Sequence, residues 1–271
     1  MNVALFQKTA YEQRWLLLMT AAGSAAFPII FLHAFDAFDF AHAEAFLNLP
    51  FVNTLIRALT GSNVSEVLNR QSLAAFPFIH PVILALGWTY VVAMATRSLA
   101  GEIENGTGEI LLSLPLTRWR IYASVTGWLV VACPVLACAT WCGATIGLTT
   151  GELRDTANGW SLRYIVVNET AMLLAVGGLA VLVSSLSVRR GRAIACAFGI
   201  LLSSFLLNVL AAFWPVAERV AFAGILRYYR PYVVLREGGP NMTDLVVLSV
   251  VAIVTWTAGG IVFTRRDIPA A

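Results

Sequence analysis

Residues 101–122 read GEIENGTGEILLSLPLTRWRIY and lie between two long apolar segments. The pair Asn105-Gly106 is a strong helix stop, because glycine accepts a positive φ and asparagine tolerates one. Thr107 can cap a new short helix. Pro115 ends that helix, since the residue before a proline is pushed out of the α region. The chain is therefore expected to turn twice within this stretch.

The short helix expected over residues 108–114 carries Ile110, Leu111 and Leu114 at i, i+1 and i+4. That spacing places the apolar side chains on one side of a helix. Together with the flanking stops, it predicts that the chain leaves the membrane at the end of one spanning helix, forms a short amphipathic helix on the membrane surface and then re-enters the membrane. Such a segment can transmit a push from a partner below the membrane. A plain interhelical loop is the alternative interpretation.

The composition excludes a soluble globular protein. Of the 271 residues, 59% are hydrophobic and 12% are charged, and the mean hydropathy is +0.77, whereas a globular domain carries about 25% charged residues. The net charge of +3 is too small to indicate a nucleic-acid partner and suits arginines at membrane surfaces. The N-terminal residues lack the pattern of a removable signal peptide.

Six apolar stretches each approach the ~20 residues needed to cross the hydrocarbon. They are expected at about Trp15–Phe35, Leu73–Thr96, Ile121–Leu148, Leu162–Leu186, Ala193–Trp214 and Leu245–Phe263. An even number of spans places both termini on one side. We therefore expect one all-α integral membrane domain over residues 1–271, with six transmembrane helices and no nucleotide-binding domain.

The residues before the first span predict a short interfacial helix. Within 2–14, Val3, Phe6 and Ala10 share one side, and Trp15 then anchors the span at the headgroups.

Positive charge in the short connections sets the expected orientation. Arg189, Arg190 and Arg192 fill the link between spans four and five, and Arg265 and Arg266 follow span six. Both groups lie on the side of the termini and of the 101–122 segment. That side is expected to be cytoplasmic.

The two long outer connections, residues 36–72 and 215–243, are each expected to contain an amphipathic helix. The apolar positions are Val52, Leu55, Ile56 and Leu59 in the first connection and Val216, Val220 and Ala223 in the last. The aromatic residues that follow in the last connection suit a belt at the headgroups.

Several catalytic patterns are absent. The chain has a single lysine, Lys8, so it contains no G-x-x-x-x-G-K-[ST] phosphate-binding loop. It also lacks G-x-S-x-G, H-E-x-x-H and C-x-x-C. We therefore expect no catalytic residue, no resident metal and no cofactor in this chain, which is not an enzyme by itself. Any ATP and magnesium must bind to a separate ATPase subunit.

Three polar residues in the expected spans are candidates for a pathway: Glu169, His80 and Asn208. A carboxylate at mid-bilayer costs about 2.5–3.5 kcal/mol on insertion scales, so such a group usually faces a cavity or a partner. For Glu169, substrate or proton handling and a plain interface position both stay open. His80 is interpreted as a kink stabiliser or a titrating gate, and Asn208 as an interhelical hydrogen-bond partner.

The four cysteines all fall in expected spans and indicate no disulfide framework. Cys138 and Cys142 share a helix face, with Cys133 a further turn away. Thiolates in this arrangement could hold Cu(I), but cysteine in a span is more often a small apolar residue.

The 101–122 segment resembles the hallmark of the type-2 permease family of ATP-binding-cassette (ABC) exporters. That hallmark reads acid-x-acid-x-Gly-Thr-x-Glu, followed by a leucine pair, a proline and an arginine. Here it falls on Glu102, Glu104, Gly106, Thr107, Glu109, Leu111-Leu112, Pro115 and Arg118. Residues 263–267 are similar to the family's C-terminal ending. The chain departs from the family at Ser124-Val125, where Gly-Lys is common, and so lacks a cation at that entry point.

The resemblance implies a permease subunit that forms the translocation path of an exporter in a prokaryotic plasma (inner) membrane. Its fold would comprise an N-terminal elbow helix, a cytoplasmic coupling helix between spans two and three, and short outer re-entrant helices that close the outer gate. Coupling to the ATPase would use Glu102, Glu104, Gly106, Thr107, Glu109, Leu112 and Pro115, with Arg118 anchoring the return at the headgroups.

The implied partners are two copies of a cytoplasmic ABC ATPase, a second permease subunit in a homodimer, and membrane lipid, without nucleic acid. Two other functions fit the same architecture. One is an ATP-driven mechanical transmitter that acts on an extracytoplasmic partner, for which the long outer connections leave room. The other is an ATP-independent channel or carrier, which the lack of an intramembrane charge chain disfavours.

Overall fold

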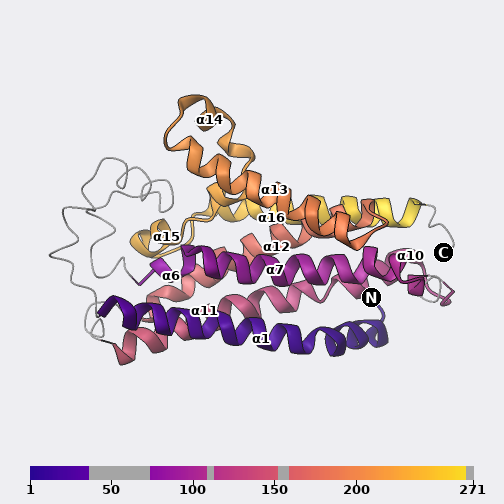
Figure 1. The fold of residues 1–271 in the computed structure, drawn as a ribbon, viewed down its shortest axis with the longest axis horizontal. Coiled ribbons are helices and arrows are strands. Elements are labelled where there is room, and N and C mark those ends of the chain that lie inside the picture. The colour runs from indigo at the N-terminus through magenta and orange to yellow at the C-terminus, as the bar shows by residue number, and fades with distance from the viewer. Residues whose placement is uncertain (37–73, 109–112, 152–158, 267–271) are drawn as a thin grey trace.

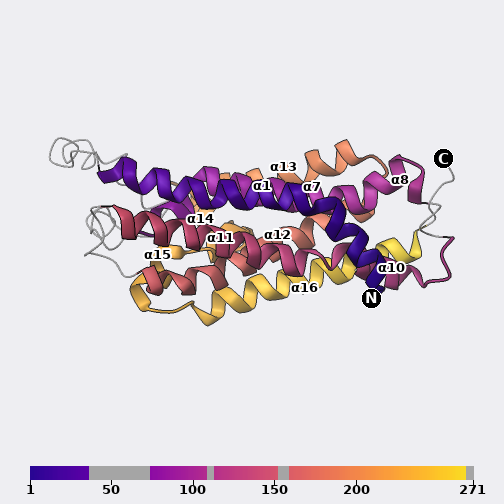
Figure 2. The same ribbon diagram turned by 90° about the horizontal axis from the view of Figure 1, so that it is seen from below.

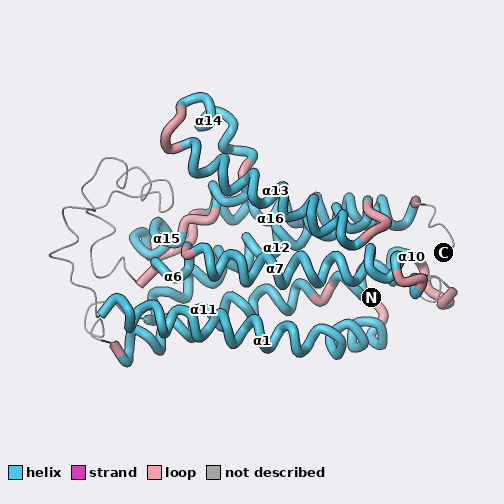
Figure 3. The backbone as a smooth tube through the Cα atoms, in the orientation of Figure 1, coloured by secondary structure: helices cyan, strands magenta, loops and turns pink. Residues whose placement is uncertain are grey.

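The computed structural model describes residues 1–36, 74–108, 113–151 and 159–266, and these ranges contain helices and no strand. The helices lie side by side along one long axis (Figure 1), and loops lie mainly toward the two ends of the bundle (Figure 3). The N-terminus and the end of the last long helix lie at one end, called here the termini end. The helices α6 and α15 lie at the opposite end, the far end.

Six helical stretches in the described residues are long and apolar enough to cross a membrane. They are α1 (Val3–Asp36), α7 with η1 and α8 (Pro81–Thr96, Arg97–Gly101, Glu102–Glu104), α10 with α11 (Arg118–Thr126, Leu129–Thr150), η3 with α12 (Gly159–Leu162, Arg163–Leu186), α13 (Arg190–Ala211) and α16 (Met242–Arg265). The shorter elements are α6 (Phe76–Ile79), α14 (Pro215–Val220), η4 (Ala221–Ala223), η5 (Ile225–Tyr228) and α15 (Pro231–Glu237).

Helix α12 is the centre of the bundle and packs against α7, α11, α13 and α16. Glycine allows the closest of these approaches. A Cβ atom added at Gly178 would lie 2.7 Å from the carbonyl oxygen of Ala252 in α16, and one at Gly259 would lie 3.2 Å from Cα of Leu182. Small residues of this kind let apolar helices pack closely where no hydrophobic force drives them together.

Helix α1 packs against α11 in the same way. Gly143 and Gly147 form a G-x-x-x-G pattern on α11. A Cβ atom at Gly143 would overlap the main chain of Ala25, and one at Gly147 would lie 3.2 Å from Cα of Ile29. These two helices are therefore in backbone contact and form a tight pair.

The second span differs from the expected Leu73–Thr96. His80 has extended backbone angles (φ −64°, ψ 135°) and separates α6 from α7, which begins at Pro81. At its other end the helix continues through the wide π-helical turn η1 and stops only at Glu104. The sequence pattern misplaced both ends, because Pro81 starts a helix at its first turn and nothing stops the helix before Asn105.

The third span also differs from the expected Ile121–Leu148. It begins earlier, at Arg118, and is interrupted at Gly127 and Trp128 before α11 continues to Thr150. Spans four, five and six begin and end within three residues of the expected positions.

The N-terminal residues do not form a separate helix. α1 is continuous from Val3 to Asp36, and Figure 2 shows its first turns bending away from the rest of the helix. No glycine or proline occurs before Gly23, so nothing in the sequence stops the helix at Trp15. At 1.5 Å per residue the helix is about 50 Å long, well beyond the ~30 Å of hydrocarbon.

The helix expected within residues 36–72 lies almost wholly outside the described residues. The last outer connection does contain short helices. α14 and η4 cover the expected positions Val216, Val220 and Ala223, and η5 and α15 then fold back onto α12.

Candidate functional site

The predicted helix stop at Asn105-Gly106 is confirmed. α8 ends at Glu104, and Gly106 has a φ of +72°. The turn is closed by Asn105 N–H donating to Gly101 O (3.0 Å) and Gly106 N–H donating to Ile103 O (3.1 Å). Glycine is required here, because a Cβ atom is disfavoured at this φ.

The coupling segment of 102–114 is consequently not one helix. Glu102–Glu104 are the last residues of the second spanning helix, and helical geometry resumes only at Thr107. The Thr107 hydroxyl donates back to the main-chain and carboxylate oxygens of Glu102. It therefore closes the turn; the forward cap expected from the sequence would act on residues 109 and 110, which lie outside the described residues.

Glu104 links this turn to the start of α13. Its Oε2 accepts a hydrogen bond from Arg190 N–H at 2.7 Å, and Arg190 is the first residue of α13. The first N–H groups of a helix have no partner within it, and a carboxylate there also interacts favourably with the helix dipole. Glu104 thus caps a helix 86 residues further along the chain.

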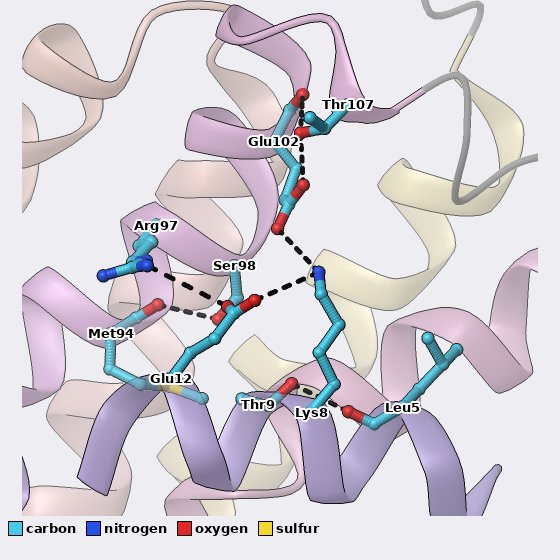
Figure 4. A network of polar contacts seen from close by, with 9 residues as sticks. All are labelled: Leu5, Lys8, Thr9, Glu12, Met94, Arg97, Ser98, Glu102 and Thr107. Carbon is cyan, nitrogen blue, oxygen red and sulfur yellow. Dashed lines mark hydrogen bonds and ion pairs between the residues drawn. The ribbon is translucent and has the colours of Figure 1, made fainter.

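Glu102 faces the other way, toward α1 (Figure 4). Its Oε1 lies 3.4 Å from Lys8 Nζ, which is also 3.4 Å from Glu12 Oε1. Arg97 extends the network to Glu12 at 4.0 Å. The only lysine of the chain therefore connects the N-terminal part of α1 to the turn.

Arg118 is the first residue of the return helix α10, and its side chain contacts the end of α16. Its guanidinium donates to the carbonyl oxygens of Thr264 (3.4 Å) and Arg266 (2.7 Å) at the end of α16. Arg266 in turn donates to the carbonyl oxygens of Ser185 and Ser187 at the end of α12, at 2.8 and 3.1 Å. The last carbonyls of a helix lack partners within it, so two arginines join three helices at the termini end.

The wide turn η1 is also connected to α12. The Ala100 N–H donates to Ser184 Oγ at 3.1 Å. Pro115 lies in the bend before Thr117, whose hydroxyl caps α10 by accepting from Arg120 N–H at 3.4 Å. Glu109 and Leu112 lie outside the described residues. The remaining predicted coupling residues gather in one region at the termini end.

Of the three pathway candidates, Glu169 lies on α12 and Asn208 on α13, while His80 separates α6 from α7. Glu169 is 3% exposed in α12; its Oε1 accepts from Thr140 Oγ1 (3.2 Å), and its Oε2 is buried without a hydrogen-bond partner among the described residues. Asn208 is half-buried on α13. No hydrogen bond among the described residues joins Glu169 to either of the others.

His80 stabilises the start of α7. Its Nδ1 accepts from Val82 N–H at 3.3 Å, and its ring packs against Phe27 with ring centroids 4.7 Å apart. An imidazolium carries a proton on Nδ1 and could not accept this bond. The contact supports the kink-stabiliser interpretation, with a main-chain N–H group as the partner.

Cys133 is buried, and Cys138, Cys142 and Cys196 are exposed. No group of three His, Cys, Asp or Glu side chains suited to a metal occurs in the described part of the chain.

Residues 8–268 match the model of a family described as ABC-2 family transporter protein. The chain belongs to this family. No curated protein gives a significant match to it. Together with the six apolar helices, ABC-2 membership identifies an integral membrane protein, the membrane-spanning subunit of an ABC transporter.

Some contacts of this ABC-2 protein were not found by sequence reasoning. No specific contact was predicted for Ser184 or Arg266, and Glu104 was not linked to α13. Each of these contacts joins residues at least 79 positions apart, and only the cluster of arginines after span six hinted at one of them.

Proposed function

We propose that this chain is a permease subunit of an ABC exporter, and that a separate ATPase moves it through the turn at residues 102–108. The observation that carries the proposal is the pair of opposed contacts made by the turn. Glu102 contacts α1 through Lys8, and Glu104 caps α13. A force on this short segment would therefore reach three spanning helices at once.

The mechanism follows from the geometry of the turn. An ATPase pair that closes on ATP pushes the turn, and the glycine corner at Gly106 transmits the push into α8 and α7. Glu104 shifts the first turn of α13, and Arg118 shifts the ends of α16 and α12. The bundle tilts, and the path opens outward or is squeezed shut. In this proposal the termini end is cytoplasmic in a prokaryotic inner membrane, and two permease copies rest on two ATPase copies.

A substitution that strains the turn at Gly106 tests the proposal. We expect Gly106→Val to leave the protein inserted but to abolish the effect of the permease on the ATP hydrolysis rate of its ATPase. A β-branched residue at positive φ costs about 1–2 kcal/mol and would push the turn out of shape. The measurement is the ATPase rate of the co-purified complex in lipid, compared with that of the isolated ATPase.

Gly238→Val is the matched control. Gly238 has a φ of +70° and ends α15 at the far end, so valine there has the same backbone cost without touching the turn. Normal coupling in Gly106→Val, or equal loss in both variants, would count against the proposal.

The second candidate is a mechanical transmitter that passes ATP-driven motion to an extracytoplasmic protein. Among the described residues no hydrogen bond joins Glu169 to His80 or Asn208, so these groups do not form a polar relay, which favours this candidate. An extracytoplasmic protein in the purified complex, with no small molecule that stimulates ATP hydrolysis, would support this candidate over export.

A further inference from the structure

The segment from Gly224 to Glu237, called here the outer segment, folds back over the far end of the bundle. It consists of η5 and α15, which contact α12, while η5 also contacts α13 and α16 and α15 contacts α6. Figure 1 shows α15 beside α6, whereas α14 projects away from the bundle. Polar contacts hold the outer segment at three places.

The first place is the Asn168 side chain on α12. Its Nδ2 donates to Tyr228 O at 3.1 Å, and its Oδ1 accepts from Arg230 N–H at 3.2 Å. Asn168 is fully buried. One amide thus satisfies two main-chain groups on either side of Tyr229, as a neighbouring strand would.

The second place is the ion pair between Arg230 and Asp244. Arg230 donates to Oδ2 of Asp244 through Nε (3.0 Å) and Nη2 (2.6 Å). The side chain of Asp244 is 6% exposed. It lies in the first turn of α16, where the helix dipole favours a carboxylate.

The third place is Tyr229, whose hydroxyl donates to Phe78 O in α6 at 2.9 Å. Burial raises the pKa of the Tyr229 hydroxyl above its usual value, and the nearby Glu169 carboxyl adds to this. On α12, Asn168 directly precedes Glu169, whose Oε2 is buried without a hydrogen-bond partner among the described residues.

We propose that Asn168, Arg230 and Asp244 are positioning residues that form a latch, which holds the outer segment against α12 and α16 in the resting permease. Release of the latch separates the outer segment from α12 at Asn168, the residue before the buried Glu169. The proposal rests on the proposed function, because the ATP-driven tilt of α12 and α16 is what separates the two anchors.

Hydrogen–deuterium exchange of the outer segment tests the latch. In the permease–ATPase complex in lipid nanodiscs, we expect the peptide containing the Arg230 amide to exchange slowly at rest. Trapping with ATP and vanadate should make it exchange faster. Asp244→Asn should produce faster exchange at rest by about tenfold, equivalent to about 1.4 kcal/mol. The charge reversal Arg230→Asp with Asp244→Arg should restore slow exchange.

Arg227→Gln is the control. It removes one positive charge from an exposed position of the outer segment, without touching the pair of Arg230 with Asp244, and should leave exchange unchanged. If Asp244→Asn does not fold, Asn168→Ala tests the other anchor with the same readout. Unchanged exchange in the folded latch variant, or equally slow exchange in the trapped and resting complexes, overturns the latch.

The two proposals fail separately. The resting comparison of Asp244→Asn with the unmodified chain needs only the permease, so the latch can hold even if no ATPase binds. Conversely, an ATPase that is coupled through Gly106 while the outer segment never changes its exchange would overturn the latch alone.

Discussion

The two ends of the bundle are held together by different kinds of polar contact. At the termini end the groups are charged, partly exposed and placed at helix ends; Lys8 is 47% exposed and its partner Glu102 19%. At the far end Asn168 is fully buried and the side chain of Asp244 is 6% exposed, although its partner Arg230 is 39% exposed. Exposed ion pairs rearrange at little cost, whereas separating buried polar partners is expensive. The termini end is therefore suited to respond to a partner, and the far end to stay shut until the whole bundle moves.

The largest effect is expected from Asp244→Ala. Removing its carboxylate takes away the single oxygen that accepts both hydrogen bonds from the Arg230 guanidinium, and should lower the free energy of unfolding by about 2 kcal/mol. This is below the 3–5 kcal/mol typical of fully buried pairs, because Arg230 keeps some access to water. Unfolding in mixed detergent micelles measures the loss. Glu237→Ala, also at the far end but exposed, should have little effect; equal losses in the two variants would show that burial does not distinguish the far end.

A smaller effect is expected from Glu104→Ala. The Arg190 N–H would lose its acceptor, and losing a helix cap typically costs about 1 kcal/mol. Because this contact joins the turn to α13, the ATPase rate of the complex should fall by more than the stability loss explains. The same two measurements on Glu218→Ala, an exposed acid of α14, give the baseline. If Glu104→Ala keeps full coupling to the ATPase, α13 does not take part in the proposed transmission of motion from the turn.

The smallest effect is expected from Lys8→Gln. The pairs of Lys8 with Glu12 and Glu102 are largely exposed, so the stability loss should be at most about 0.5 kcal/mol. The difference between the variant and the unmodified protein should shrink at high ionic strength, because salt screens exposed pairs. Micelle unfolding at low and high salt measures this. A loss as large as that of Asp244→Ala would erase the contrast between the two ends.

Hydropathy and local turn chemistry predicted much of this fold. The six spans follow from the length of the apolar stretches, and the positive φ of Gly106 follows from the Asn105-Gly106 pair. Local patterns were less informative at the start of the second span. Pro81 can kink a long helix or begin a new one, and only packing against α1, where His80 meets Phe27, decides between these outcomes.

The site itself was predictable as a region but not as a set of contacts. The acidic residues and the glycine of the turn were identified, yet their partners Lys8 and Arg190 lie 94 and 86 residues from Glu102 and Glu104, respectively. Helix ends display the same unpaired N–H and C=O groups wherever they occur. Which end meets which side chain depends on the three-dimensional order of the spans, and no local spacing encodes it.

The position of the only lysine has a practical consequence. Lys8 Nζ lies between two carboxylates, one on its own helix and one on the turn. An amine-reactive acylating reagent would neutralise this nitrogen and leave Glu12 and Glu102 facing each other as like charges. The acylated side chain would no longer attract either carboxylate, and the repulsion between them would push α1 and the turn apart. One chemical modification could therefore separate two structural elements without any change of sequence.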